Sequence, residues 1–138
     1  VMAVVLVLAA SAHVAAQAAP IAIQARLVLG TSKEQKDQME ASAAIKSKLA
    51  RVFKWKHYYE LNSKQMNIAD TVTKSAKLRR AAQIKVTNRK NGRVSVILFS
   101  KGKMLVQKTQ NLKPGSHMVL AGNTAAEEAW FIVLTKSK

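Results

Sequence analysis

The sequence predicts a mainly β protein of the α+β type, with about seven antiparallel strands in a sandwich or a barrel-like meander and one amphipathic helix near the N-terminus. Three features predict this fold: short segments of alternating apolar and polar residues, turn dipeptides between them, and one stretch of helical periodicity. Short strands with regularly spaced turns are typical of sandwiches and barrels. The strands are expected at residues 24–30, 58–61, 83–88, 93–100, 103–110, 117–121 and 129–135.

The helix is expected at residues 33–53. Thr31 and Ser32 are two possible N-caps, because each stands three residues before a Glu or Gln, as in a capping box. Apolar residues then recur at helical spacing and give the segment one apolar face. These residues are Ala41, Ile45, Leu49, Val52 and Phe53.

Turn signals and apolar runs place the strands. Asn91-Gly92 indicates a hairpin because both residues tolerate positive φ, and Pro114-Gly115 fits the centre of a type II turn. Residues 130–134 form a continuous apolar run, which is typical of a strand buried on both faces. Residues 62–73 are mainly polar and are expected outside the strands, and Gly122-Asn123 is expected to separate the last two strands.

The first residues have the features of a signal peptide. Residues 1–10 are an apolar run, and Ala16-Gln17-Ala18 fits a cleavage site. Cleavage after Ala18 would leave residues 19–138 as a single basic domain, exported to the periplasm or cell envelope. The alternative is a retained N-terminal membrane anchor, since the uncharged stretch reaches the length of a span.

The charge is strongly one-sided. The chain has 23 Lys and Arg against 7 Asp and Glu, a net charge of +16. Residues 71–126 contain twelve basic residues and no acidic one. A surface of one sign attracts polyanions. There is no cysteine, which excludes disulfides, thiolate metal sites and Cys nucleophiles.

No catalytic, cofactor-binding or metal-binding residue is predicted, and an enzyme is not expected. His57 and His117 do not belong to a ligand-spaced pair. Glu127 and Glu128 are adjacent, so on a strand they would point to opposite faces. Ser116 lacks the glycines that surround a nucleophile in an elbow motif.

The binding candidates are cations interleaved with an aromatic residue, together with the basic residues of the later strands. Lysine neutralises a polyanion, and aromatic rings stack on bases or sugars. The candidates are Lys54, Trp55, Lys56, Arg79, Arg80, Lys85, Arg89, Lys90, Arg93, Lys101 and Lys103. Under the alternative interpretation, Trp55 and Tyr58 close the hydrophobic core, and the basic residues are solvent faces that discourage aggregation.

Three segments carry a family likeness: LARVFKWKHYYEL at 49–61, LKPG at 112–115 and AWFIVL at 129–134. In this order the chain resembles a group of small exported bacterial proteins of unassigned activity. In that group a leader is followed by a strand, a helix ending near an aromatic-rich strand, and a β meander. The resemblance implies export and a mainly β fold, and it implies no catalytic residue.

The leading functional hypothesis is a non-enzymatic envelope protein that binds an acidic partner through a Lys/Arg-rich β surface. The partner would be an anionic membrane surface, an acidic polysaccharide, or an acidic subunit of a larger envelope complex. The first alternative is a nucleic-acid-binding domain, in which the leader is misread. The second is a small exported enzyme with an unrecognised site.

Overall fold

The computed structural model describes residues 20–125 and 127–137. The expected signal peptide at residues 1–18 therefore lies outside the described residues. In the described part the protein is mainly β, with two antiparallel sheets and one short helix. The elements are β1 (Ile21–Thr31), β2 (Met39–Glu40), α1 (Ala43–Ala50), β3 (His57–Ile68), β4 (Thr73–Lys77), β5 (Ala82–Asn88), β6 (Arg93–Ser100), β7 (Lys103–Asn111), β8 (His117–Thr124) and β9 (Glu128–Lys136).

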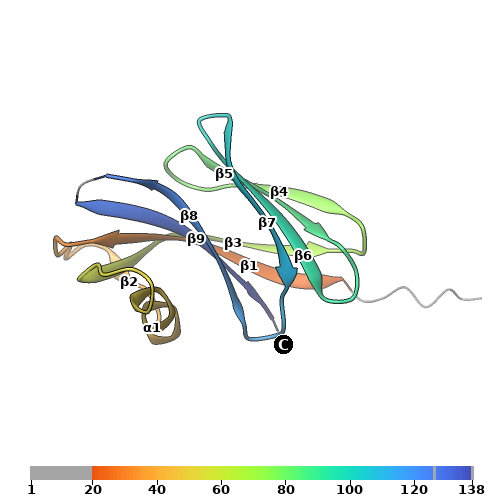
Figure 1. Ribbon diagram of the computed structural model, residues 1–138, viewed down its shortest axis with the longest axis horizontal. Helices are drawn as coiled ribbons and strands as arrows, with labels where there is room; N and C mark the ends of the chain where they lie inside the picture. Colours follow the sequence, from red (N-terminus) through yellow and green to blue (C-terminus); the bar gives the residue numbers. More distant parts are fainter. Residues whose placement is uncertain (1–19, 126, 138) are drawn as a thin grey trace, which may run out of the picture.

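The two sheets form separate layers that pack on each other (Figure 1). The five-stranded sheet has the order β2-β3-β1-β9-β8, and the four-stranded sheet is the meander β4-β5-β6-β7. β1 lies between β3 and β9, so the first and last strands of the domain pair directly. The chain passes between the sheets from β3 to β4 and from β7 to β8.

A shared core fills the space between the sheets. In β5 and β6, side chains such as Ile84, Val86 and Val96 point inward and are fully buried, as the alternation predicts. Leu27 and Ile132 face them from the five-stranded sheet and belong to the same cluster. The sandwich therefore follows from period-two patterning on both sides of one core.

α1 covers the opposite face of the five-stranded sheet (Figure 1). Ile45 and Leu49 of the helix are buried in a second cluster with Phe131. Phe53, just beyond the helix, packs against Phe131 with ring centroids 4.5 Å apart. Residues 130–134 are buried on both faces, as predicted, because alternate side chains enter the two clusters.

The predicted helix at residues 33–53 is wrong in its first half. α1 begins only at Ala43, and its N-cap is Ser42, whose Oγ accepts a hydrogen bond from the Ile45 amide at 3.3 Å. Thr31 instead ends β1, and neither it nor Ser32 caps a helix. Residues 32–38 contain no apolar side chain, so a helix there would have nothing to bury.

The expected count of seven strands is also wrong, because residues 20–125 and 127–137 already contain nine. The first part of the polar stretch at 62–73 is not a loop, because β3 continues to Ile68, and only residues 69–72 connect it to β4. Met66 and Ile68 alternate with exposed residues and enter the core. β4 is an additional edge strand, and β8 runs through Gly122-Asn123 instead of ending there.

The turns predicted at Asn91-Gly92 and at Pro114-Gly115 are confirmed. Asn91 and Gly92 have φ values of 54° and 79°, and they connect β5 to β6. Gly115 has a φ of 80° in the connection from β7 to β8, as a type II turn requires.

Candidate acidic-partner surface

Charge is divided unequally between the two sheets. The four-stranded sheet with its turns, residues 73–111, contains eleven basic residues and no acidic residue. All seven carboxylate side chains of the sequence lie outside this segment. All charged side chains of this sheet and its turns are therefore positive.

Almost none of these charges is compensated within the described residues. Four ion pairs occur there: Arg26–Glu60, Lys33–Glu127, Lys46–Glu40 and Arg80–Glu128. Only Arg80 comes from the four-stranded sheet, and its guanidinium lies 3.0 Å from the Glu128 carboxylate. The remaining ten basic residues of the sheet have no such partner in the described part of the chain.

The outer face of the four-stranded sheet is built by the residues that alternate with the core positions. One row across the strands consists of Lys77, Gln83, Phe99 and Met104, which are paired in register. Lys85 of the next row holds its amine 5.4 Å from the Phe99 ring centroid. The face therefore combines exposed cations with partly exposed apolar side chains.

Hydroxyl groups form one row across the same face, near the turn between β5 and β6. Thr73 and Thr87 join β4 to β5 through a hydroxyl contact of 2.6 Å. Ser95 and Thr109 do the same between β6 and β7 at 2.7 Å. Arg89 donates from Nε to the Ser95 hydroxyl at 3.0 Å, which directs this side chain over the sheet.

Four of the predicted candidates meet at one end of the sheet. The turn between β4 and β5 carries Arg79 and Arg80, and Lys101 and Lys103 lie at the turn between β6 and β7. The two turns are joined by a hydrogen bond from the Lys101 amide to the Ala81 carbonyl at 3.2 Å. We call this region the hairpin end.

Exposed apolar residues accompany the cations at the hairpin end. Met104 is 60% exposed and Leu105 is 37% exposed at the start of β7. Both follow directly after Lys103. The hairpin end therefore offers apolar side chains surrounded by positive charge.

A second group of candidates lies at the other end of the same strands. Arg89, Lys90 and Arg93 surround the turn between β5 and β6. The seven residues of β5 separate this turn from the hairpin end, a distance of about 20 Å at roughly 3.4 Å per residue. Lys85 lies between the two groups, on the outer face.

Lys54, Trp55 and Lys56 belong to a different part of the molecule, the connection from α1 to β3. Trp55 is partly buried, and its indole packs directly against Gly30. The contact is so close that a Cβ atom built on Gly30 would lie 2.6 Å from the indole Cδ1. Tyr58 is buried and donates its hydroxyl to the Phe53 carbonyl at 3.1 Å. Burial raises the pKa of this phenol. Both rings thus pack where the alternative interpretation places them, against the core under α1.

The acidic residues near the hairpin end are engaged in ion pairs. Glu127 lies 2.7 Å from the Lys33 amine, and this hydrogen bond raises the pKa of Lys33. Glu128 pairs with Arg80. Within residues 20–125 and 127–137, no three His, Asp or Glu side chains are grouped so that they could hold a metal ion.

Sequence reasoning missed three residues of this surface. Lys77 lies on β4, which was not predicted as a strand. Phe99 lies on the outer face because it alternates with the core residue Leu98 in β6, and this position could have been predicted. Met104 joins it there because a register shift follows Leu98 in the pairing of β6 with β7.

Comparison of the chain with protein-family models, curated proteins and solved structures finds no match. Among the helices of the described residues, none combines the length and apolarity needed to cross a membrane. The functional argument therefore rests on the surface itself.

Proposed function

We propose that the protein is a non-enzymatic binding protein whose four-stranded sheet docks on an extended acidic surface, and that this surface is an anionic lipid bilayer. One observation carries the proposal: of eleven basic residues in the sheet and its turns, one has a carboxylate partner among the described residues. Unpaired charges of one sign repel each other in the free protein, and a surface of opposite charge relieves that repulsion.

The hairpin end favours lipid over other acidic partners. Exposed Met104 and Leu105 provide apolar surface that a bilayer interface can bury, while Lys101 and Lys103 remain at the level of the headgroups. A polysaccharide partner would instead use exposed aromatic rings. Trp55 packs over Gly30, and the Phe99 ring of the outer face is covered by the Lys85 amine.

The location of the protein is part of the same proposal. An exported chain, as residues 1–18 predict, would meet an anionic leaflet of the cell envelope. The bound state would need no insertion of a helix, because cations and a few apolar side chains at a strand turn give reversible interfacial binding.

The test is sedimentation of the protein with phosphatidylcholine vesicles, with and without phosphatidylglycerol. We expect binding only to the anionic vesicles, and weaker binding as salt rises. Each Lys or Arg near an anionic surface contributes about 1 kcal/mol, so replacing both Lys101 and Lys103 by Gln should weaken binding about 30-fold. Met104→Ser should also weaken binding without a change in stability, because this side chain is 60% exposed.

The matched control is Lys36→Gln with Lys64→Gln, which removes the same charge from exposed positions outside the four-stranded sheet. Equal weakening by both double variants would refute a specific surface. Absence of vesicle binding, together with tight binding of duplex DNA, would support the nucleic-acid alternative. In that case about five phosphate contacts would give a slope near −4.5 for log affinity against log salt.

A further inference from the structure

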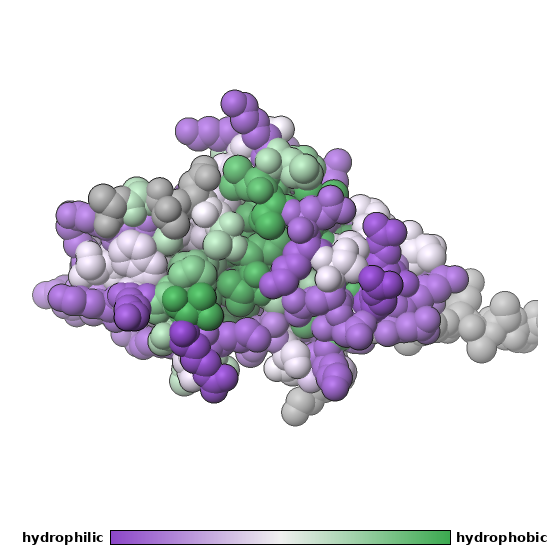
Figure 2. Space-filling model, viewed as in Figure 1, coloured by the Kyte–Doolittle hydropathy of each residue, from purple (hydrophilic) through white to green (hydrophobic). Residues whose placement is uncertain are grey.

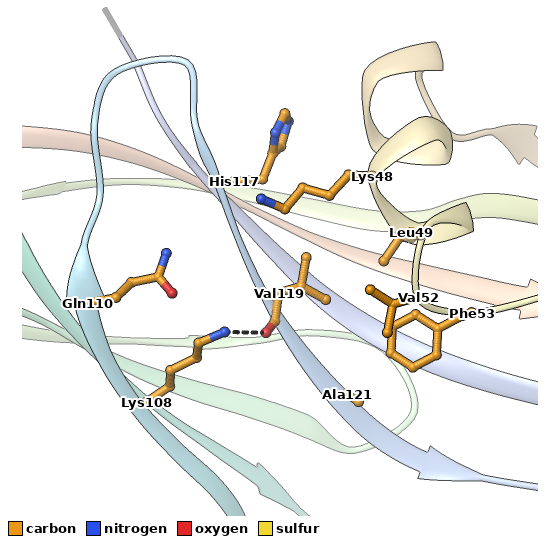
Figure 3. Close-up of a pocket in the computed structure, with 9 residues that line it drawn as sticks. All are labelled: Lys48, Leu49, Val52, Phe53, Lys108, Gln110, His117, Val119 and Ala121. Atoms are coloured by element: carbon orange, nitrogen blue, oxygen red, sulfur yellow. Dashed lines mark hydrogen bonds between the residues drawn. The ribbon is translucent and has the colours of Figure 1, made fainter.

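A groove lies on the other side of the molecule from the outer face of the four-stranded sheet. It is formed where the end of α1, the outer face of β8 and the edge strand β7 meet, and it has a volume of about 310 Å³ (Figure 3). This is near the lower limit of the volumes that small-molecule sites have. Figure 2 shows hydrophobic residues across the middle of the viewed face, with hydrophilic residues around them.

The apolar wall of the groove follows from the alternation in β8. Met118 and Leu120 point into the shared core, so Val119 and Ala121 point to the opposite face. α1 ends at Ala50 and leaves this strip of β8 open. Leu49, Val52 and Phe53 complete the wall from the helix side. Val52 is 74% exposed, although it stands at a position that the sequence pattern assigned to the buried face.

The polar groups of the groove carry positive charge or none. Lys48 reaches in from α1 and Lys108 from β7, and Gln110 and His117 are the other polar residues of the lining (Figure 3). The Lys108 amine donates to the Val119 carbonyl at 3.3 Å. No carboxylate is among the residues that line this groove in the described part of the chain, and neither lysine is in an ion pair there.

The pKa of His117 reflects the positive charge around this groove. Burial lowers its pKa, and the neighbouring charges of Lys48 and Arg26 lower it further. Arg26 is itself balanced by Glu60, whose carboxylate lies 2.7 Å from the guanidinium. Lys48 and Lys108 have no such counter-charge, so an anion placed between them would be attracted by both amines.

We propose that this groove binds an amphiphilic anion, a single alkyl chain that ends in a carboxylate. The headgroup would lie at the amines of Lys48 and Lys108, and the chain would lie against Val119, Val52 and Phe53. Both parts of such a ligand have a complement in the groove: two cations without acidic partners among the described residues, and an adjoining apolar wall. The inference does not depend on vesicle binding, because the groove and the hairpin end use different residues.

The experiment is isothermal calorimetry of the full chain with decanoate below its micellar concentration. Decanol and acetate serve as probes that lack, respectively, the charge and the chain. We expect saturable binding of one decanoate and much weaker binding of either other probe. Hydrogen bonds to a charged group are among the stronger ones, so Lys48→Gln should weaken decanoate binding about ten-fold.

The control is Lys46→Gln on the same helix, whose amine is held by Glu40 at 3.3 Å and does not line the groove. Ala121→Trp, introduced at an exposed position, should fill the groove and abolish binding while the thermal transition stays cooperative. Proton NMR adds a second readout: bound decanoate should raise the pKa of His117, since its charge opposes those of Lys48 and Arg26.

Equal binding of decanol and decanoate, or equal affinity of the Lys48→Gln and Lys46→Gln variants, would overturn the proposal. So would decanoate binding that leaves the His117 resonances unchanged. Failure of vesicle binding alone would leave these results unaffected, so the two proposals can fail separately.

Discussion

The contact between Gly122 and Trp130 makes a quantitative prediction about the sandwich core. Trp130 belongs to the core cluster between the sheets and is 8% exposed. A Cβ added to Gly122 would overlap the Trp130 indole. Gly122→Ala should therefore destabilise the protein by about 1–3 kcal/mol, the usual range for overpacking. Trp130→Ala should cost about 3–5 kcal/mol because it leaves a cavity.

The two substitutions should not be additive. With Trp130 replaced by Ala, the methyl group of Gly122→Ala enters vacated space, and its cost should disappear. The double variant should then be more stable than the sum of the single costs predicts, by about 1–3 kcal/mol. The assay is urea unfolding followed by far-ultraviolet circular dichroism, which does not depend on the indole that is removed. Additive costs, or a Gly122→Ala variant as stable as the parent, would refute this account of the core.

Three further predictions concern the helix cap, a buried amide and a histidine. Ser42→Ala should cost about 1 kcal/mol in urea unfolding, because the Ile45 amide loses its cap; Ser47→Ala, an exposed position inside the helix, is the control. Asn88→Ala should cost about 1–3 kcal/mol, because the buried amide at present donates to the Ile68 carbonyl at 3.1 Å; a smaller loss would mean that water replaces it. The pKa of His117 is lowered in the folded state, so the unfolded chain binds more protons and stability should fall as pH drops below about 6.5. His117→Asn should remove this part of the pH dependence, and an unchanged profile between variants would contradict it.

The central strands could be predicted because their signals are local. β6 was expected at the residues it occupies, since apolar alternation and two flanking turns mark both of its ends. β4 could not be predicted in this way. Its five residues, TKSAK, contain only one apolar side chain, and the strand exists because its backbone pairs with β5. An edge strand of this kind is specified by its neighbour more than by its own pattern.

The helix, in contrast, was predicted over more residues than it occupies. The capping-box pattern after Thr31 favoured an early start, yet that residue remains in β1 and is buried. Most helical stability in proteins comes from packing of an apolar face, and the apolar positions of this segment begin only at Met39 and Ala41. The structure accordingly begins the helix after them, at Ala43.

The candidate surface was predicted in its charge but not in its geometry. Ten of the eleven residues named as candidates are divided between the hairpin end, the opposite end of β5 and the connection after α1, and Lys85 lies between the two ends of β5. Only the topology determines which of them meet. Met104 has the same parity as the partly buried Val106, so strict alternation would have placed both on one face. The register shift pairs Val106 with Leu98 and Met104 with Phe99, and this puts Met104 on the outer face.

The same topology bears on the alternative explanation, that basic residues serve only to discourage strand pairing between molecules. That explanation applies to edge strands, and four of the eleven basic residues lie on the edges β4 and β7. Lys85 and Arg93 lie on the inner strands β5 and β6, where both backbone edges are already paired. The other five are in the turns, where no strand edge is present. Protection of edges would not require positive charge at these seven positions or the absence of carboxylates from the whole sheet, whereas attraction to an extended acidic surface would favour both.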